Sequence, residues 1–123
     1  MINREVEIRN WPGKGRGECL DLLVQVTTHG GTPVGVVVEV KGCWNAGLDT
    51  AMENQLRDQY LIDSIHNHGI YLVGWYGPQG GGNSCKADLH LLRRQLDEQA
   101  ASLCVGNINI RAVVVDLSLN KKP

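Results

Sequence analysis

Three side chains that can bind a metal ion and activate water fall within two neighbouring apolar segments. Asp21 lies in "CLDLLVQV" (19–26), and Glu39 and Lys41 lie in "VVVEVKG" (36–42). Carboxylate oxygens are preferred ligands of Mg2+, and a bound metal ion polarises a phosphoryl group and lowers the pKa of a bound water. A nearby ammonium group orients that water or stabilises developing negative charge. These residue types therefore suit metal-assisted hydrolysis of a phosphodiester.

The spacing of the two segments predicts a β-hairpin that brings the three side chains together. The segments are separated by "TTHGGTP" (27–33), which is rich in turn residues. If the paired position numbers sum to 60, Asp21 lies opposite Glu39 and Lys41 lies on the same side. The other side is then wholly apolar, and we expect it to be the buried face, made of Leu20, Leu22, Val24, Val26, Val34, Val36, Val38 and Val40. A slip of one residue would destroy both groupings.

Two carboxylates opposed across a strand pair repel each other, so a compensating charge is needed. A divalent cation held by Asp21 and Glu39 supplies it, with a backbone carbonyl such as that of Val40 and waters completing the octahedron. The alternative is a solvent-exposed sheet face on which these carboxylates and Lys41 are ordinary polar residues. The periodicity of the sequence leaves both interpretations open.

The remaining segments predict an α/β domain. Residues 4–9 alternate as a strand, 45–69 read as an amphipathic helix, 70–76 as a buried strand, 87–105 as a second amphipathic helix and 108–119 as a final strand. The order strand, two-strand hairpin, helix, strand, helix, strand allows βαβ crossovers onto a mixed sheet with helices packed on its faces.

The composition predicts a single domain over residues 1–123. Of the 123 residues, 42% are apolar and 20% are charged, which suits a folded domain. The formal net charge is -1, so any contact with nucleic acid must come from a local basic patch. The absence of a ~20-residue apolar segment and of a secretory signal predicts a cytoplasmic protein without membrane contact. No C-x-x-C pair is present, so we expect reduced free thiols at Cys19, Cys43, Cys85 and Cys104.

Asp21 in "GECLDLLV" and the "EVK" of residues 39–41, with the hairpin between them and a helix after them, resemble the PD-(D/E)XK nuclease superfamily over residues 4–76. The resemblance implies a restriction endonuclease-like three-layer core, a central mixed β-sheet flanked by helices. It also implies that Asp21 and Glu39 bind Mg2+, with Mn2+ as a substitute, and that Lys41 assists the attacking water. The expected activity is cleavage of DNA, by an endonuclease rather than an exonuclease.

Members of the RecB type resemble this chain further through a glutamine and a tyrosine, Q-x-x-x-Y, on the next helix. Here Gln55 and Tyr60 are five residues apart, which rotates them by about 140° in an α-helix, so Gln59 shares the face of Gln55. We expect Gln55 to line the site, with Tyr60 as a further candidate. The family also has an acidic residue on a helix before the first strand. Either Glu5 or Glu7 partly replaces it, or the chain is a domain of a longer protein.

Basic and polar residues near the expected site are candidate DNA contacts. Lys14 and Arg16 in "WPGKGRG" precede Asp21 and would hold phosphates near the scissile one, with further contacts assigned to Asn45 and Arg57. The alternative is that Lys14 and Arg16 are ordinary solvent-exposed charges of a loop, with no role in binding. Trp44 and Trp75 either stack on bases or anchor the core.

The resemblance implies several settings for such a domain. Cleavage of duplex DNA requires two active sites, which suits a homodimer. Domains of this type are often attached to ATPase or sensor modules in restriction and antiphage systems. The main alternative function is a catalytically silent nucleic-acid-binding or assembly module of the same fold, and a third is an α/β interaction domain whose acidic pair is solvated.

Overall fold

The computed structural model describes residues 5–10, 21–27, 29–61, 66–77, 85 and 88–118. The chain forms, in order, β1 (Glu5–Asn10), β2 (Asp21–Thr27), β3 (Pro33–Gly42), α1 (Leu48–Ala51), the π-helix η1 (Met52–Leu61), β4 (His68–Trp75), α2 (Leu89–Leu103) and β5 (Asn109–Asp116). The predicted order of strands and helices is confirmed. The helix expected over residues 45–69 begins later, at Leu48, and it is π-helical from Met52 to Leu61.

The strands form one mixed sheet in the order β1-β2-β3-β4-β5. The pairs β1–β2 and β2–β3 are antiparallel, whereas β3–β4 and β4–β5 are parallel. Parallel neighbours need a long crossover connection, and the chain supplies one through α1 and η1 and another through α2. The α/β class with a mixed sheet is therefore confirmed.

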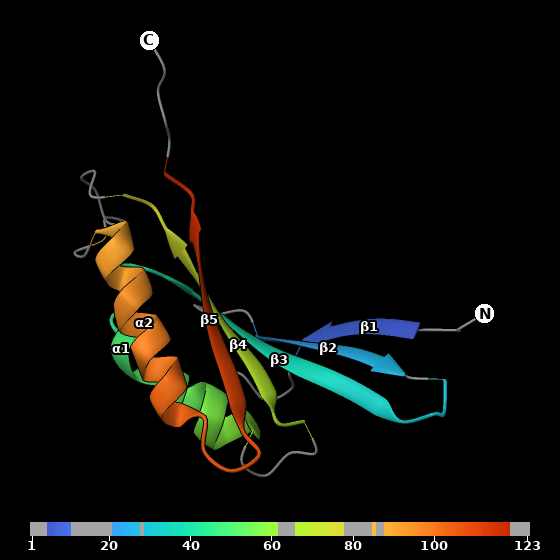
Figure 1. Ribbon diagram of the computed structural model, residues 1–123. Helices are drawn as coiled ribbons and strands as arrows, with labels where there is room; N and C mark the ends of the chain where they lie inside the picture. The colour runs from blue at the N-terminus through green and yellow to red at the C-terminus, as the bar shows by residue number, and fades with distance from the viewer. Residues whose placement is uncertain are drawn as a thin grey trace.

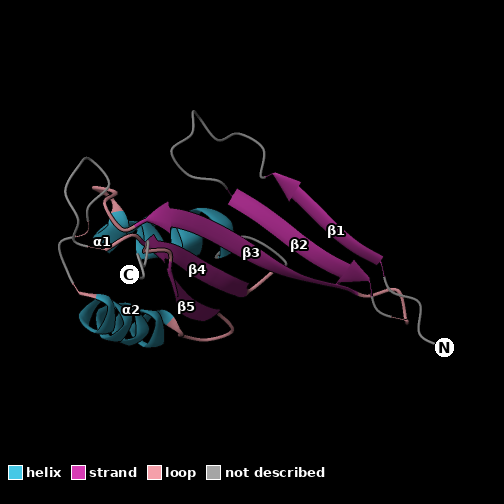
Figure 2. Cartoon of the chain, turned by 90° about the horizontal axis from the view of Figure 1, so that it is seen from above, coloured by secondary structure: helices cyan, strands magenta, loops and turns pink. Residues whose placement is uncertain are grey.

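Both helical segments pack on the same face of the sheet, which we call the covered face. The segment η1 contacts β3 and β4, and α2 contacts β5 and η1. Figures 1 and 2 show them together on one side of β3, β4 and β5. The core lies between these layers and includes Val37, Met52, Leu56, Tyr71, Val73 and Leu96. The described part of the chain thus has two layers where we expected three.

The expectation that the even-numbered face of the hairpin is the buried one is wrong. Val34 on that face is 49% exposed, whereas Glu39 on the other face is fully buried. Right-handed crossovers that proceed in one direction across a sheet place their helices on the same face. Tyr71 and Val73 complete the core on that face, so the helices cover the odd-numbered residues of β3 and leave the valines of the even positions on the other side.

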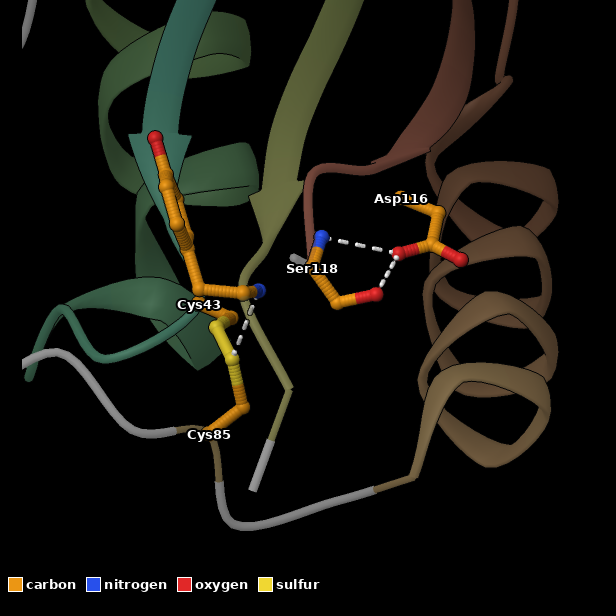
Figure 3. The surroundings of a disulfide bond; sticks show 5 residues. Cys43, Cys85, Asp116 and Ser118 are labelled. Atoms are coloured by element: carbon orange, nitrogen blue, oxygen red, sulfur yellow. Dashed lines mark hydrogen bonds between the residues drawn. A yellow bond between two sulfur atoms is a disulfide. The ribbon is translucent and has the colours of Figure 1, made fainter. Parts of the chain in front are cut away.

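A disulfide joins Cys43, just after β3, to Cys85 (Figure 3). The Cys43 N–H donates to the carbonyl of Gly74 at 2.9 Å, and the Tyr76 N–H donates to the Cys85 sulfur at 3.3 Å. The expectation of free thiols is therefore wrong for this pair and correct for Cys104, while Cys19 lies outside the described residues. The 42 residues between the two cysteines hid their proximity, which the parallel pairing of β3 with β4 creates.

Within the described ranges, no helix is long and apolar enough to cross a membrane.

Candidate functional site

The register of β2 and β3 brings Asp21 and Glu39 together as the sequence predicts. Their Cα positions are paired, and the neighbouring pairs Leu22–Val38, Leu23–Val37 and Val24–Val36 follow the same rule. The backbone of Asp21 is therefore directly across from Glu39, although the position of its side chain lies outside the described part of the chain. Lys41 lies two residues further along β3 and on the covered face.

Glu39 and Lys41 form a buried ion pair on the third strand of the sheet. The Lys41 Nζ lies 3.5 Å from the Glu39 Oε2, and the side chains are 4% and 0% exposed, respectively. Removing two charges from water carries a large desolvation penalty, which their mutual attraction offsets only in part. Glu39 and Lys41 therefore do not belong to a solvent-exposed polar face, so that alternative is wrong for the part of the site that lies on β3.

The π-helical geometry of η1 changes the relation between Gln55 and Tyr60. Hydrogen bonds in a π-helix link residues five apart, so such residues lie about one turn apart on the same side of the helix. The expectation that Gln55 and Tyr60 point in different directions holds for an α-helix and is wrong here. Tyr60 is buried and Gln55 is half-buried, and η1 packs against β3 and β4.

Tyr71 is a site neighbour that the sequence analysis missed. It pairs with Glu39 across the parallel strands β3 and β4 and is fully buried. Its hydroxyl donates a 2.7 Å hydrogen bond to the carbonyl of Leu48, the first residue of α1. A tyrosine inside an apolar strand requires a partner for its hydroxyl, which was the available signal. Tyr71 thereby fixes the start of the helical segment beside the ion pair.

Two predicted DNA contacts are engaged within the chain. The Asn45 Oδ1 accepts a hydrogen bond from the Gly47 N–H at 2.7 Å, in the turn that leads into α1. Arg57 donates to Asp58 at 2.7 Å and to Glu53 at 3.1 Å. The hydrogen bond with Asp58 is the main cause of a raised pKa for Arg57. The polar groups that we assigned to DNA therefore have local partners.

Glu7 is not brought to the site. Its backbone pairs with Gln25, four residues along β2 from Asp21. Four residues of a strand span roughly 13 Å at ~3.3 Å per residue, so the backbone positions of Glu7 and Asp21 are well separated along the sheet. Lys14 and Arg16 lie outside the described residues.

The donor groups present suit Mg2+ better than a softer metal. Among the residues that the structure describes, no cluster of three or more His, Cys, Asp or Glu side chains is close enough to hold an ion. The predicted set contains two carboxylates, of Asp21 and Glu39, and the carbonyl of Val40. Oxygen ligands of this kind, completed by water, are typical of Mg2+.

We compared the chain with models of protein families, with curated proteins and with solved structures, and found no match in any of the three.

Proposed function

We propose that this chain is a metal-dependent nuclease domain of the PD-(D/E)XK type that hydrolyses phosphodiester bonds in DNA. The observation that carries the proposal is the buried Glu39–Lys41 ion pair, which lies on β3 opposite the backbone of Asp21. A buried ion pair is poor at stabilising a fold, since apolar residues of similar volume often do as well or better. Ionisable side chains that are buried together are candidates for a functional site.

Each residue has a separate role in the proposed reaction. Asp21 and Glu39 would hold the ion together with the Val40 carbonyl. Bound Mg2+ would polarise the phosphoryl group and lower the pKa of a bound water. Lys41, whose ammonium group lies 3.5 Å from the Glu39 carboxylate, orients that water and stabilises the negative charge that develops on phosphorus oxygens.

The helical segment supports the same proposal. Gln55 and Tyr60 lie about one turn apart on η1, so one side of this helix presents both residues. Gln55 is the proposed site-lining residue, and Tyr71 holds the segment in place through Leu48. Lys14 and Arg16 remain the proposed phosphate contacts. The proposal includes a role as the effector of a restriction or antiphage system.

Plasmid nicking tests this function. Supercoiled plasmid is incubated with the wild type in Mg2+, in Mn2+ or in EDTA, and with Asp21→Asn, Glu39→Gln and Lys41→Met. The expected result is metal-dependent nicking that each substitution lowers by about 100-fold or more, since a group that stabilises the transition state contributes that much. Glu98→Gln, on the exposed side of α2, is the matched control and should nick normally. Circular dichroism confirms that each variant is folded.

A wild type that does not nick in either metal contradicts the proposal, as do variants that nick as well as the wild type does. The same preparations then test the second candidate, a catalytically silent DNA-binding module. The ion pair favours this candidate in one respect, because Lys41 balances the charge of Glu39 without a metal. Such a module binds DNA with an affinity that falls as salt rises, and it leaves the DNA intact.

A further inference from the structure

The sheet face opposite the helices, which we call the open face, is apolar over β2 to β5. It consists of the even-numbered positions of β2, β3 and β4 and the odd-numbered positions of β5. No helix in the described part of the chain covers it, and Figure 2 shows both helices on the other side. Its apolar side chains are exposed at Val34, Val113 and Val115, half-buried at Leu22, Val24, Val36, Val40, Ile70 and Leu72, and buried at Val38. Apolar patches of this extent mark interaction surfaces.

An aromatic knob stands at one end of the open face. Trp44, Tyr76 and Leu117 follow the ends of β3, β4 and β5 and fold back over Gly42 and Gly74. The rings of Trp44 and Tyr76 meet edge to face with centroids 4.9 Å apart, and they are 41% and 39% exposed. The two glycines make room for these side chains, because a Cβ at Gly74 would lie 2.9 Å from the Leu117 side chain and one at Gly42 would clash with the Trp44 indole unless these side chains shifted.

A hollow lies at the opposite end of the same face, where β3, β4 and β5 begin. Its volume is about 480 Å3, and it is lined by Val34, Val36, His68, Gly69, Ile70, Asn109 and Arg111. Its walls combine valine and isoleucine with a few polar groups at the margin. An aromatic ring suits such a site, since the Asn109 amide can pair with an indole N–H or a phenol hydroxyl. The Arg111 guanidinium can stack on the ring face.

We propose that two copies of this chain associate through their open faces, with the aromatic knob of each copy in the hollow of the other. Knob and hollow lie at opposite ends of one face, and a two-fold axis that lies in the plane of the interface and runs across the strands near Leu72 exchanges its ends. Both contacts then form at once, as an isologous interface requires. Two sheets pack in this way at ~10 Å with their strands nearly aligned.

The size and charge of the face agree with this partner. A strand spacing of ~4.8 Å and a rise of ~3.3 Å per residue give four strands of about seven residues a footprint of roughly 450 Å2. Two facing copies cover twice that area, roughly 900 Å2 before the relief of the side chains is counted, which is close to the ~1,000 Å2 that a biological interface should clear. Among the described side chains that β2 to β5 place on this face, only His68 and Arg111 are acidic or basic. Nucleic acid needs many more positive charges.

Sedimentation equilibrium over a range of protein concentrations tests the dimer. We expect a dimer for the wild type, and an increase of about 100-fold or more in the dimer Kd for Trp44→Ala combined with Tyr76→Ala. Val113→Glu should act similarly, because it places a charge in the centre of the interface. Val105→Glu is the matched control: Val105 is a more exposed valine (68% against 42% for Val113) on the turn after α2, so its dimer should persist.

A mixing experiment tests the pairing of knob and hollow. Val34→Trp fills the hollow and leaves the knob, whereas Trp44→Ala with Tyr76→Ala removes the knob and leaves the hollow. Neither variant can form a knob-in-hollow contact with itself, but a mixture of the two restores one contact. Native mass spectrometry should therefore show more heterodimer than either homodimer. Circular dichroism checks the folding of each variant.

A monomeric wild type at all concentrations overturns the proposal, which includes the case in which another part of the chain covers the face. A dimer that survives both the knob removal and Val113→Glu overturns it too, since that dimer uses another surface. A mixture without excess heterodimer overturns the knob-in-hollow arrangement. None of these results depends on nuclease activity.

Discussion

The covered and open faces of this sheet differ from what the sequence of β3 suggests. The side of β3 that carries its charged residues is covered by the helices, and the side that carries only apolar residues and glycine is not. The covered face holds Glu39 and Lys41 at a depth where charges are costly, and the open face presents valines that would suit a core. A strand therefore does not decide its own buried side. The crossovers decide it, because they place both helices on one face together with Tyr71 and Val73. Charges on the covered face must serve something other than solubility, and apolar residues on the open face must serve something other than the core.

The largest expected loss of stability comes from breaking the ion pair of the covered face. Lys41→Ala should lower the free energy of unfolding by about 3–5 kcal/mol, because it leaves the Glu39 carboxylate buried without the ammonium group. Urea denaturation measures this change. A loss below about 1 kcal/mol would show that the pair is not buried as described.

The companion variant separates function from stability. Glu39→Leu combined with Lys41→Met replaces the pair by apolar groups of similar volume, and it should be as stable as the wild type or more stable by up to about 4 kcal/mol. It should nevertheless have no nicking activity. A double variant that is both stable and active would refute the role of the pair in catalysis.

The disulfide, whose cysteines are buried with the core of the covered face, should have the next effect. It closes a loop of 42 residues, for which the chain-entropy relation gives about 4 kcal/mol. Dithiothreitol should therefore lower the Tm of the wild type and leave Cys43→Ser unchanged. Cys104→Ser, at the free cysteine, is the control and should respond to the reductant as the wild type does. An unchanged wild-type Tm, with the disulfide shown to be reduced by mass spectrometry, would contradict this expectation.

A matched pair of substitutions compares the two faces directly. Val37→Thr puts a hydroxyl on the covered face, where the side chain has no exposed surface, and should cost about 1–3 kcal/mol. Val113→Thr makes the same change on the open face and should stay within about 0.5 kcal/mol. Unfolding is followed at several protein concentrations so that any contribution from the dimer is separated. Equal costs for the two variants would erase the distinction between the faces.

The smallest expected effect lies at the end of β5. Asp116 accepts hydrogen bonds from the Ser118 hydroxyl at 2.6 Å and from the Ser118 N–H at 3.0 Å (Figure 3). These bonds, the hydroxyl first, hold the pKa of Asp116 below its ordinary value. Because the folded pKa is depressed, the stabilisation is present above the ordinary pKa and is lost as the pH falls through the folded one.

Ser118→Ala removes the larger cause, so the pKa of Asp116 should rise toward its ordinary value. A carboxyl-detected NMR titration of both proteins measures the shift, and the small acid-dependent loss of Tm that Asp116 contributes should be smaller in the variant. An Asp116 pKa that is the same in both proteins would exclude Ser118 as its cause. Thr50→Ala, an exposed position on α1, provides the control substitution.

The sequence was sufficient for the parts of the fold that depend on local pattern. The hairpin register, with Asp21 opposite Glu39, follows from alternation over eight residues and one loop. The covered face could not be predicted from the hairpin, since Leu22 and Leu23 are equally apolar and only the later packing of Tyr71 selects between their sides. The Cys43–Cys85 contact depends on the pairing of β3 with β4, which no short-range pattern reports.

The π-helix η1 has a consequence for how such chains are recognised by pattern. A chain with one residue fewer between Gln55 and Tyr60 would present both from the same side of an ordinary α-helix. A spacing of five residues in the wider π-helical turn thus gives the two side chains about the same direction as a spacing of four residues in an α-helix. A search that fixes the spacing at four residues treats these two motifs as different. A search that scores the direction of side chains along the helix would group them together.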